Sequence, residues 1–116
     1  MKTILKMIFV LALTASCESK VTAKFIVENK TDFTIDSLSF EPDSKSQFFS
    51  LAPGSRLNLQ TNMDTVNMDG SFRVHFRNAS TKVWTHQNFG YYSNGMPLED
   101  YIQLTIQTDT IIVEYQ

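Results

Sequence analysis

Apolar and polar residues alternate along most of the chain from residue 23 onward. The clearest case is residues 71–77, where three apolar side chains alternate with two arginines and a histidine. A period of two places alternate side chains on opposite faces of a strand. No stretch of ten or more residues has the apolar spacing of an amphipathic helix. The pattern predicts strands at residues 24–28, 33–40, 47–51, 56–60, 71–77, 82–89, 101–107 and 110–115.

Eight short strands at spacings near ten residues indicate an all-β fold. We expect an antiparallel two-sheet sandwich of about seven or eight strands, immunoglobulin-like or similar. Residues 33–40 change their apolar face halfway along, which predicts a bulge near Asp36 and Ser37. The side chains expected in the core include Phe72, Val74, Phe76, Ile102, Leu104 and Ile106, with Arg73, His75 and Arg77 on the outer face.

The first 16 residues follow a different pattern, which is typical of a signal peptide. Two lysines precede seven consecutive apolar residues and then three small ones. The apolar stretch is shorter than the roughly 20 residues that a membrane-spanning helix needs. We therefore assign residues 1–16 to a signal peptide, 17–22 to a tether and 23–116 to the folded domain.

The end of this segment, Leu13-Thr14-Ala15-Ser16-Cys17, resembles the lipobox of bacterial lipoproteins. The resemblance implies cleavage before Cys17 and acylation of its thiol, although Thr14 stands where the lipobox prefers leucine. Cys17 is the only cysteine in the chain, and a free thiol would be unusual in an oxidising compartment. The alternative is an ordinary signal peptide with an unmodified cysteine. Two or three acyl chains would anchor the protein stably to a membrane.

Composition and charge limit the class of partner. Apolar residues make up 42% of the chain and charged residues 19%, as in a globular protein. The net charge is −2, and removal of residues 1–16 leaves 8 basic and 12 acidic residues. Nucleic acid is therefore not expected as a partner, because phosphate binding needs a basic surface.

No catalytic or metal-binding pattern stands out. The serines lie outside any Gly-x-Ser-x-Gly motif. His75 and His86 have no second ligand at a strong metal-binding spacing, and two arginines flank His75 in its strand. We therefore expect two solvated histidines, no metal, no cofactor and no enzymatic activity.

The most distinctive segment is residues 88–97, which combines three aromatic residues, two glycines and a turn-forming Asn-Gly pair. Exposed aromatic side chains in a connection would make a binding surface for a protein or a glycan. Alternatively, the same rings plug one end of the sandwich. The candidate binding loop consists of Phe89, Tyr91, Tyr92 and Asn94.

The run Phe89-Gly90-Tyr91-Tyr92-Ser93-Asn94-Gly95 also resembles a segment of small uncharacterised lipoproteins of Gram-negative bacteria, which have a β-sandwich domain. This resemblance implies a fold and a location, but no activity. The expected location is the cell envelope, with the lipid in the outer membrane and the domain on its periplasmic or surface face.

Three tripeptides resemble the Asp-Ser/Thr-apolar acceptor for O-glycosylation of exported proteins in some Gram-negative bacteria. Two of them lie in or beside predicted strands. The third, Asp64-Thr65-Val66, lies in a polar loop, so Thr65 is the candidate glycosylation site.

Together these features favour a lipid-anchored, non-enzymatic binding or accessory module. One alternative is an inhibitor or immunity-type lipoprotein that masks a protein partner, which would need about 800 Å² of contact on each side. A small envelope enzyme is the third possibility, and it would need a pocket with polar groups of perturbed pKa.

Overall fold

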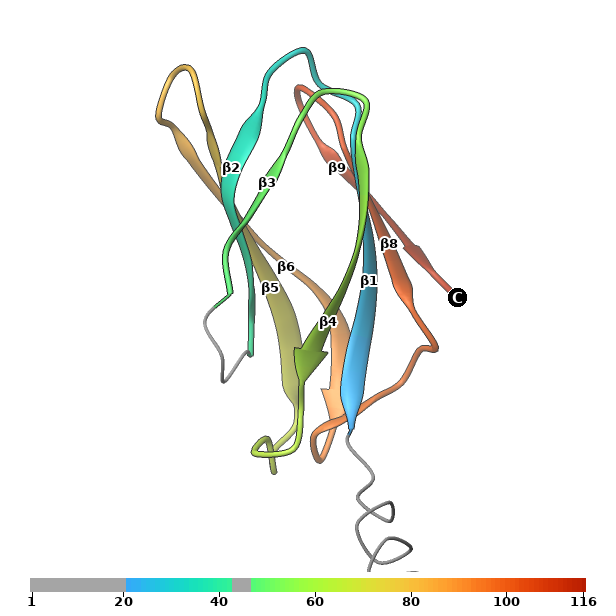
Figure 1. The fold of residues 1–116 in the computed structure, drawn as a ribbon. Coiled ribbons are helices and arrows are strands. Elements are labelled where there is room, and N and C mark those ends of the chain that lie inside the picture. Colours follow the sequence, from blue (N-terminus) through green and yellow to red (C-terminus); the bar gives the residue numbers. More distant parts are fainter. Residues whose placement is uncertain (1–20, 43–46) are drawn as a thin grey trace, which may run out of the picture.

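The computed structural model describes residues 21–42 and 47–116, which form two β-sheets facing each other across a common core (Figure 1). The predicted all-β sandwich is confirmed. The signal peptide and Cys17 lie outside the described residues. Within the described part of the chain, no helix is long and apolar enough to cross a membrane. The strands are β1 (Thr22–Asn29), β2 (Ile35–Glu41), β3 (Phe49–Leu51), β4 (Arg56–Asn62), β5 (Gly70–Asn78), β6 (Trp84–Ser93), β7 (Met96–Pro97), β8 (Ile102–Ile106) and β9 (Ile111–Tyr115).

The first sheet has the strand order β4-β1-β8-β9, and the second has the order β3-β2-β5-β6-β7. Neighbouring strands are antiparallel, as predicted, except for β1 and β8, which are parallel. This pair differs from the prediction because β8 begins at the same end of the sandwich as β1, with Ile102 opposite Phe25. The two-residue strand β7 was not predicted, and β6 extends to Ser93, beyond the predicted end at residue 89.

Phenylalanine rings from both sheets form the centre of the core. Phe25 on β1 is 1% exposed and lies among rings of the second sheet. Its ring stacks on Phe40 with centroids 4.6 Å apart, and meets Phe72 and Phe89 edge-on at 5.1 and 5.4 Å. Edge-to-face and offset contacts are the favoured geometries for aromatic pairs. The six apolar side chains that alternation assigned to the core, on β5 and β8, are all buried.

The bulge expected in β2 is present. Asp36 lies opposite Arg77 and Ser39 lies opposite His75, so three steps along β2 match two along β5. Ser37 takes up the extra residue with a φ of 52°. An extra residue reverses the alternation of a strand. The apolar side chains before and after the bulge therefore both enter the core.

Candidate functional site

The aromatic segment 88–97 is a strand and a tight turn. Its first part completes β6, which pairs with β5. Phe72 lies opposite Phe89 and Gly70 lies opposite Tyr92, so β6 has one residue more than β5 in this interval. Gly90, with a φ of 63°, lies within this bulge. A glycine in the left-handed region is typical of one common type of β-bulge.

The bulge decides which aromatic side chains reach solvent. Phe89 and Tyr92 are three residues apart, yet both are buried, at 5% and 7% exposure. The Tyr92 ring lies 5.1 Å from that of Phe72. Tyr91 points the other way and is 49% exposed. Of the three rings in the predicted binding loop, two therefore belong to the core and only Tyr91 is available to a partner.

Asn94 has a conformational role. Asn94 and Gly95 have φ values of 50° and 76° and connect β6 to β7, with Ser93 opposite Met96. Two central residues with positive φ are the signature of the type I′ hairpin, for which Asn-Gly is preferred. The Asn94 backbone N–H donates a hydrogen bond to Asp69 Oδ1 at 2.7 Å. The predicted turn is confirmed, and Asn94 shapes it from an exposed position.

Tyr91 lines a surface hollow of about 300 Å³, together with Gly90, Leu98, Glu99 and Tyr115. Leu98 is 59% exposed and Tyr115 is 50% exposed. The Tyr115 hydroxyl accepts a hydrogen bond from the Gly90 N–H at 3.2 Å, which joins the C-terminal strand to the bulge. We call this group of five residues the Tyr91 hollow. It combines two exposed aromatic rings and a leucine with one carboxylate.

Tyr115 and Leu98 were absent from the sequence-based candidates. Tyr115 ends β9 in the first sheet, whereas Tyr91 lies on β6 in the second. Their proximity depends on how the two sheets are superposed. The alternation of apolar and polar residues within one strand does not predict this proximity.

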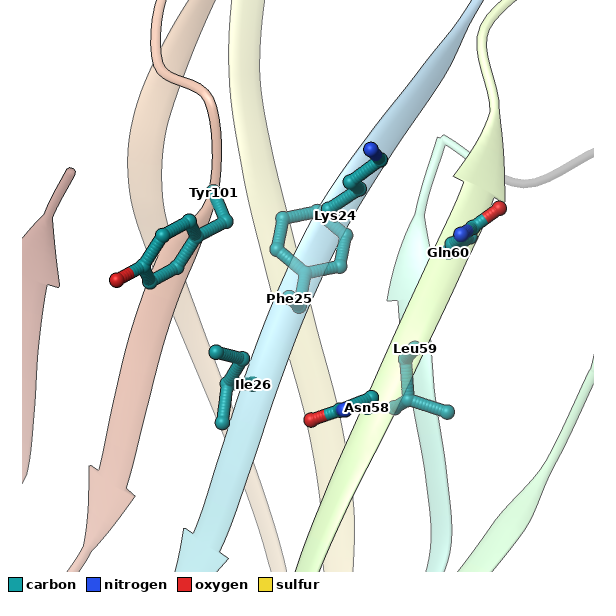
Figure 2. Close-up of a pocket in the computed structure, with 7 residues that line it drawn as sticks. All are labelled: Lys24, Phe25, Ile26, Asn58, Leu59, Gln60 and Tyr101. Atoms are coloured by element: carbon teal, nitrogen blue, oxygen red, sulfur yellow. The ribbon is translucent and has the colours of Figure 1, made fainter.

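A second hollow, of about 260 Å³, lies on the outer face of the first sheet. Figure 2 shows the residues that line it. Ile26 of β1 and the ring of Tyr101 form its apolar part, and both are half-buried. Lys24, Asn58 and Gln60 add a cation and two amides. This hollow was also not predicted, because it combines outward-facing positions of β1 and β4 with the segment before β8.

The outer face of the second sheet carries a connected row of polar and aromatic side chains. His75 and His86 lie directly opposite each other on β5 and β6, with an Nδ1–Nδ1 distance of 2.5 Å. The Nε2 atom of His75 lies 2.8 Å from Glu41 Oε2. The Trp84 ring lies parallel to that of His86, with centroids 6.0 Å apart. Both histidines were expected to be solvated. His86 is exposed, but His75 is half-buried, and the strand register makes the two histidines partners.

The row continues to an ion pair between β5 and β2. The Arg77 guanidinium lies 5.8 Å from the centre of the Trp84 ring. Its Nε and Nη2 donate to the two carboxylate oxygens of Asp36 at 2.7 and 2.9 Å. These hydrogen bonds, and the attraction of the guanidinium charge, hold the pKa of Asp36 below its usual value. The same contacts raise the pKa of Arg77.

Among the described residues, no group of three or more His, Cys, Asp or Glu side chains is arranged to hold a metal ion. The candidate glycosylation residue Thr65 is exposed in the connection between β4 and β5. The preceding Asp64 accepts a hydrogen bond from the backbone N–H of Val21 at 2.8 Å. This contact fixes the connection beside the start of β1 and leaves Thr65 accessible.

Comparisons with known proteins give no relative: no family model, no curated protein and no solved structure matches this chain.

Proposed function

We propose that the protein is a lipid-anchored binding module of the bacterial cell envelope, without enzymatic activity. The lipid on Cys17 would hold it in the outer membrane, and residues 17–21 would connect the lipid to the sandwich. β1 begins at Thr22, so the tether is short and the domain would remain close to the membrane surface. The partner is a protein or a glycan of the envelope.

One observation carries the proposal: the aromatic and apolar side chains of the Tyr91 hollow are exposed together. Tyr91, Leu98 and Tyr115 each have about half of their surface accessible. Single exposed apolar residues are ordinary, but a group of them marks a binding surface. Tyrosine is enriched in such surfaces because its rigid ring contacts apolar and polar groups at once. The hydrogen bond from Gly90 to Tyr115 holds the two sides of the hollow together.

The location is tested with Cys17→Ser, which removes the acylated atom and changes nothing in the described domain. Wild-type protein should sediment with membranes from a detergent-free lysate and incorporate radiolabelled palmitate. The variant should be soluble and unlabelled. A variant that still sediments with membranes would contradict the lipid anchor.

The binding surface is tested by photo-cross-linking in cells that make the lipidated protein. Tyr91 is replaced by p-benzoylphenylalanine, an aromatic residue of related shape. The control places the same group at Thr81, which is exposed in the turn between β5 and β6. We expect a discrete adduct from position 91 and none from position 81. Equal yields at both positions, or no adduct from position 91, would contradict the proposed surface.

A further inference from the structure

The histidine pair on β5 and β6 has a defined proton arrangement. A carboxylate can only accept a hydrogen bond, so the contact with Glu41 requires a proton on Nε2 of His75. Neutral His75 then has its lone pair on Nδ1, which is the atom that faces Nδ1 of His86. In the neutral pair His86 is therefore the donor and His75 the acceptor. Glu41 thus leaves the Nδ1 lone pair of His75 directed at a second imidazole.

We propose that His75 and His86 form a two-nitrogen chelating site for a divalent transition metal, with Cu²⁺ bound most tightly. This inference is independent of the proposed function. Imidazole is a preferred ligand for copper, nickel and zinc, and Cu²⁺ has the highest affinity among the divalent first-row metals. Water molecules would complete the coordination shell, since the site supplies only two protein ligands.

The geometry requires a small adjustment. Two nitrogens bound at about 2.0–2.1 Å to one metal ion lie about 3 Å apart. The two Nδ1 atoms are now 2.5 Å apart, so they need to separate by about half an ångström. The rings are inclined at 71°, and His86 is exposed. Rotation of the side chains can therefore direct both lone pairs at one point in solvent, once the Nδ1 proton of His86 has moved to Nε2 or to water.

Glu41 would be the positioning residue of this site. A metal-binding histidine commonly donates its other N–H to a carboxylate, which fixes the tautomer and raises the basicity of the ligand nitrogen. The Glu41–His75 contact has this form before any metal binds. The flanking arginines do not leave a net positive charge here. Arg77 is paired with Asp36, and the charge of Arg73 is matched by that of Glu41 on the adjacent strand.

The chain contains its own reporter for the bound ion. Trp84 is the only tryptophan, and its ring lies parallel to that of His86 at 6.0 Å. Cu²⁺ quenches indole emission at such short range. The experiment is a titration of the full chain carrying Cys17→Ser, which removes the only thiol, with CuSO₄ at neutral pH. We expect quenching that saturates at one ion per chain, and an electron paramagnetic resonance spectrum with two equatorial nitrogens.

Three variants separate a chelate from general binding to histidine. His75→Gln should weaken Cu²⁺ binding at least tenfold and remove one nitrogen from the spectrum. Glu41→Gln should also weaken it, by about tenfold or more, through the ligand's basicity. The matched control combines His86→Asn with Asn88→His. It retains both histidines but moves one to the position opposite Arg73, and we expect a tenfold loss.

Circular dichroism checks that each variant is folded, which we expect because the four substituted side chains lie on the outer face of the sheet. Equal Cu²⁺ affinity in the wild type and His75→Gln, or in the wild type and the control with the moved histidine, would overturn the chelate. So would the absence of quenching at millimolar Cu²⁺.

Discussion

The side-chain amide of Asn29 donates a hydrogen bond to the backbone carbonyl of Leu51 at 3.0 Å, and this contact joins the two sheets. Asn29 ends β1 in the first sheet, and Leu51 ends β3 in the second. The same Nδ2 donates to the carbonyl of Phe33 at 2.9 Å, and Oδ1 accepts from the N–H and hydroxyl of Thr31. Asn29 is 0% exposed. Its polar groups are therefore satisfied entirely by the protein.

Asn29→Ala should lower the free energy of unfolding by about 2–4 kcal/mol, because the carbonyl of Leu51 and the N–H and hydroxyl of Thr31 each lose a buried hydrogen bond. Urea unfolding measures the loss. Asn58→Ala is the control, since Asn58 is exposed on the neighbouring strand β4, and it should change stability by less than about 0.5 kcal/mol. Similar small losses in both variants would show that this amide does not hold the sheets together.

Gly90→Ala should destabilise the domain by about 2–4 kcal/mol. A Cβ atom at this position would lie 2.7 Å from Ile102 Cδ1 and 3.1 Å from Phe72 Cδ2, in addition to the strain of a φ of 63°. Gly54→Ala is the matched control. Gly54 has a φ of 77°, but nothing lies within 4 Å of a Cβ there, so only the backbone strain of about 1–2 kcal/mol applies. Equal losses would mean that the bulge is not closely packed.

Tyr92→Ala and Tyr91→Ala should differ sharply in thermal stability. Loss of the buried Tyr92 ring should cost about 3 kcal/mol and lower the Tm by more than about 10 °C. The exposed Tyr91 ring should contribute about 0.5 kcal/mol or less. Scanning calorimetry gives both values. A large loss of thermal stability in Tyr91→Ala would show that this ring is needed for the fold and would exclude it from the proposed binding surface.

The ion pair between Asp36 and Arg77 should make stability depend on acid pH. The folded-state pKa of Asp36 is lowered, mainly by hydrogen bonds from Arg77. The stabilisation it gives is therefore fully present above the unfolded-state pKa, near pH 4, and is lost as the pH falls through the folded value. Wild type should exceed Asp36→Asn in stability at pH 7, and this difference should shrink below about pH 4. In Arg77→Gln, an NMR titration should show the Asp36 pKa returning toward its usual value. An unchanged difference between pH 7 and pH 3 would contradict the pair's role.

Alternation predicted the parts of the fold that depend on single strands. Residues 71–77 bury Phe72 and Phe76 and direct Arg73 to solvent, because one sheet face is apolar and the other is wet. The bulge at Ser37 was visible in the sequence since it reverses the apolar face within one strand. Such features follow from the local period of two.

Features that depend on strand register could not be predicted from the alternation within a single strand. The bulge at Gly90 decides which of Tyr91 and Tyr92 is buried, and this bulge exists only through the pairing of β6 with β5. His75 and His86 meet only because their strands pair at that offset. The contact between Gly90 and Tyr115 needs the position of one sheet over the other. Tyr91 is therefore the only aromatic residue of the predicted loop whose ring is exposed in the candidate site. The residues beside it, Leu98 and Tyr115, cannot be identified from the pattern of a single strand.

The most direct test of the proposed binding surface uses the four tyrosines of the chain, labelled as 3-fluorotyrosine in the Cys17→Ser protein. Tyr91 and Tyr115 report on the Tyr91 hollow, Tyr101 reports on the hollow in Figure 2, and the buried Tyr92 is the internal control. ¹⁹F NMR spectra are recorded while purified bacterial peptidoglycan sacculi or solubilised bacterial envelope proteins are added. We predict that the Tyr91 and Tyr115 resonances shift or broaden with one of these fractions, while those of Tyr101 and Tyr92 do not. Changes confined to Tyr101, or no change with either fraction, would contradict the proposed binding surface.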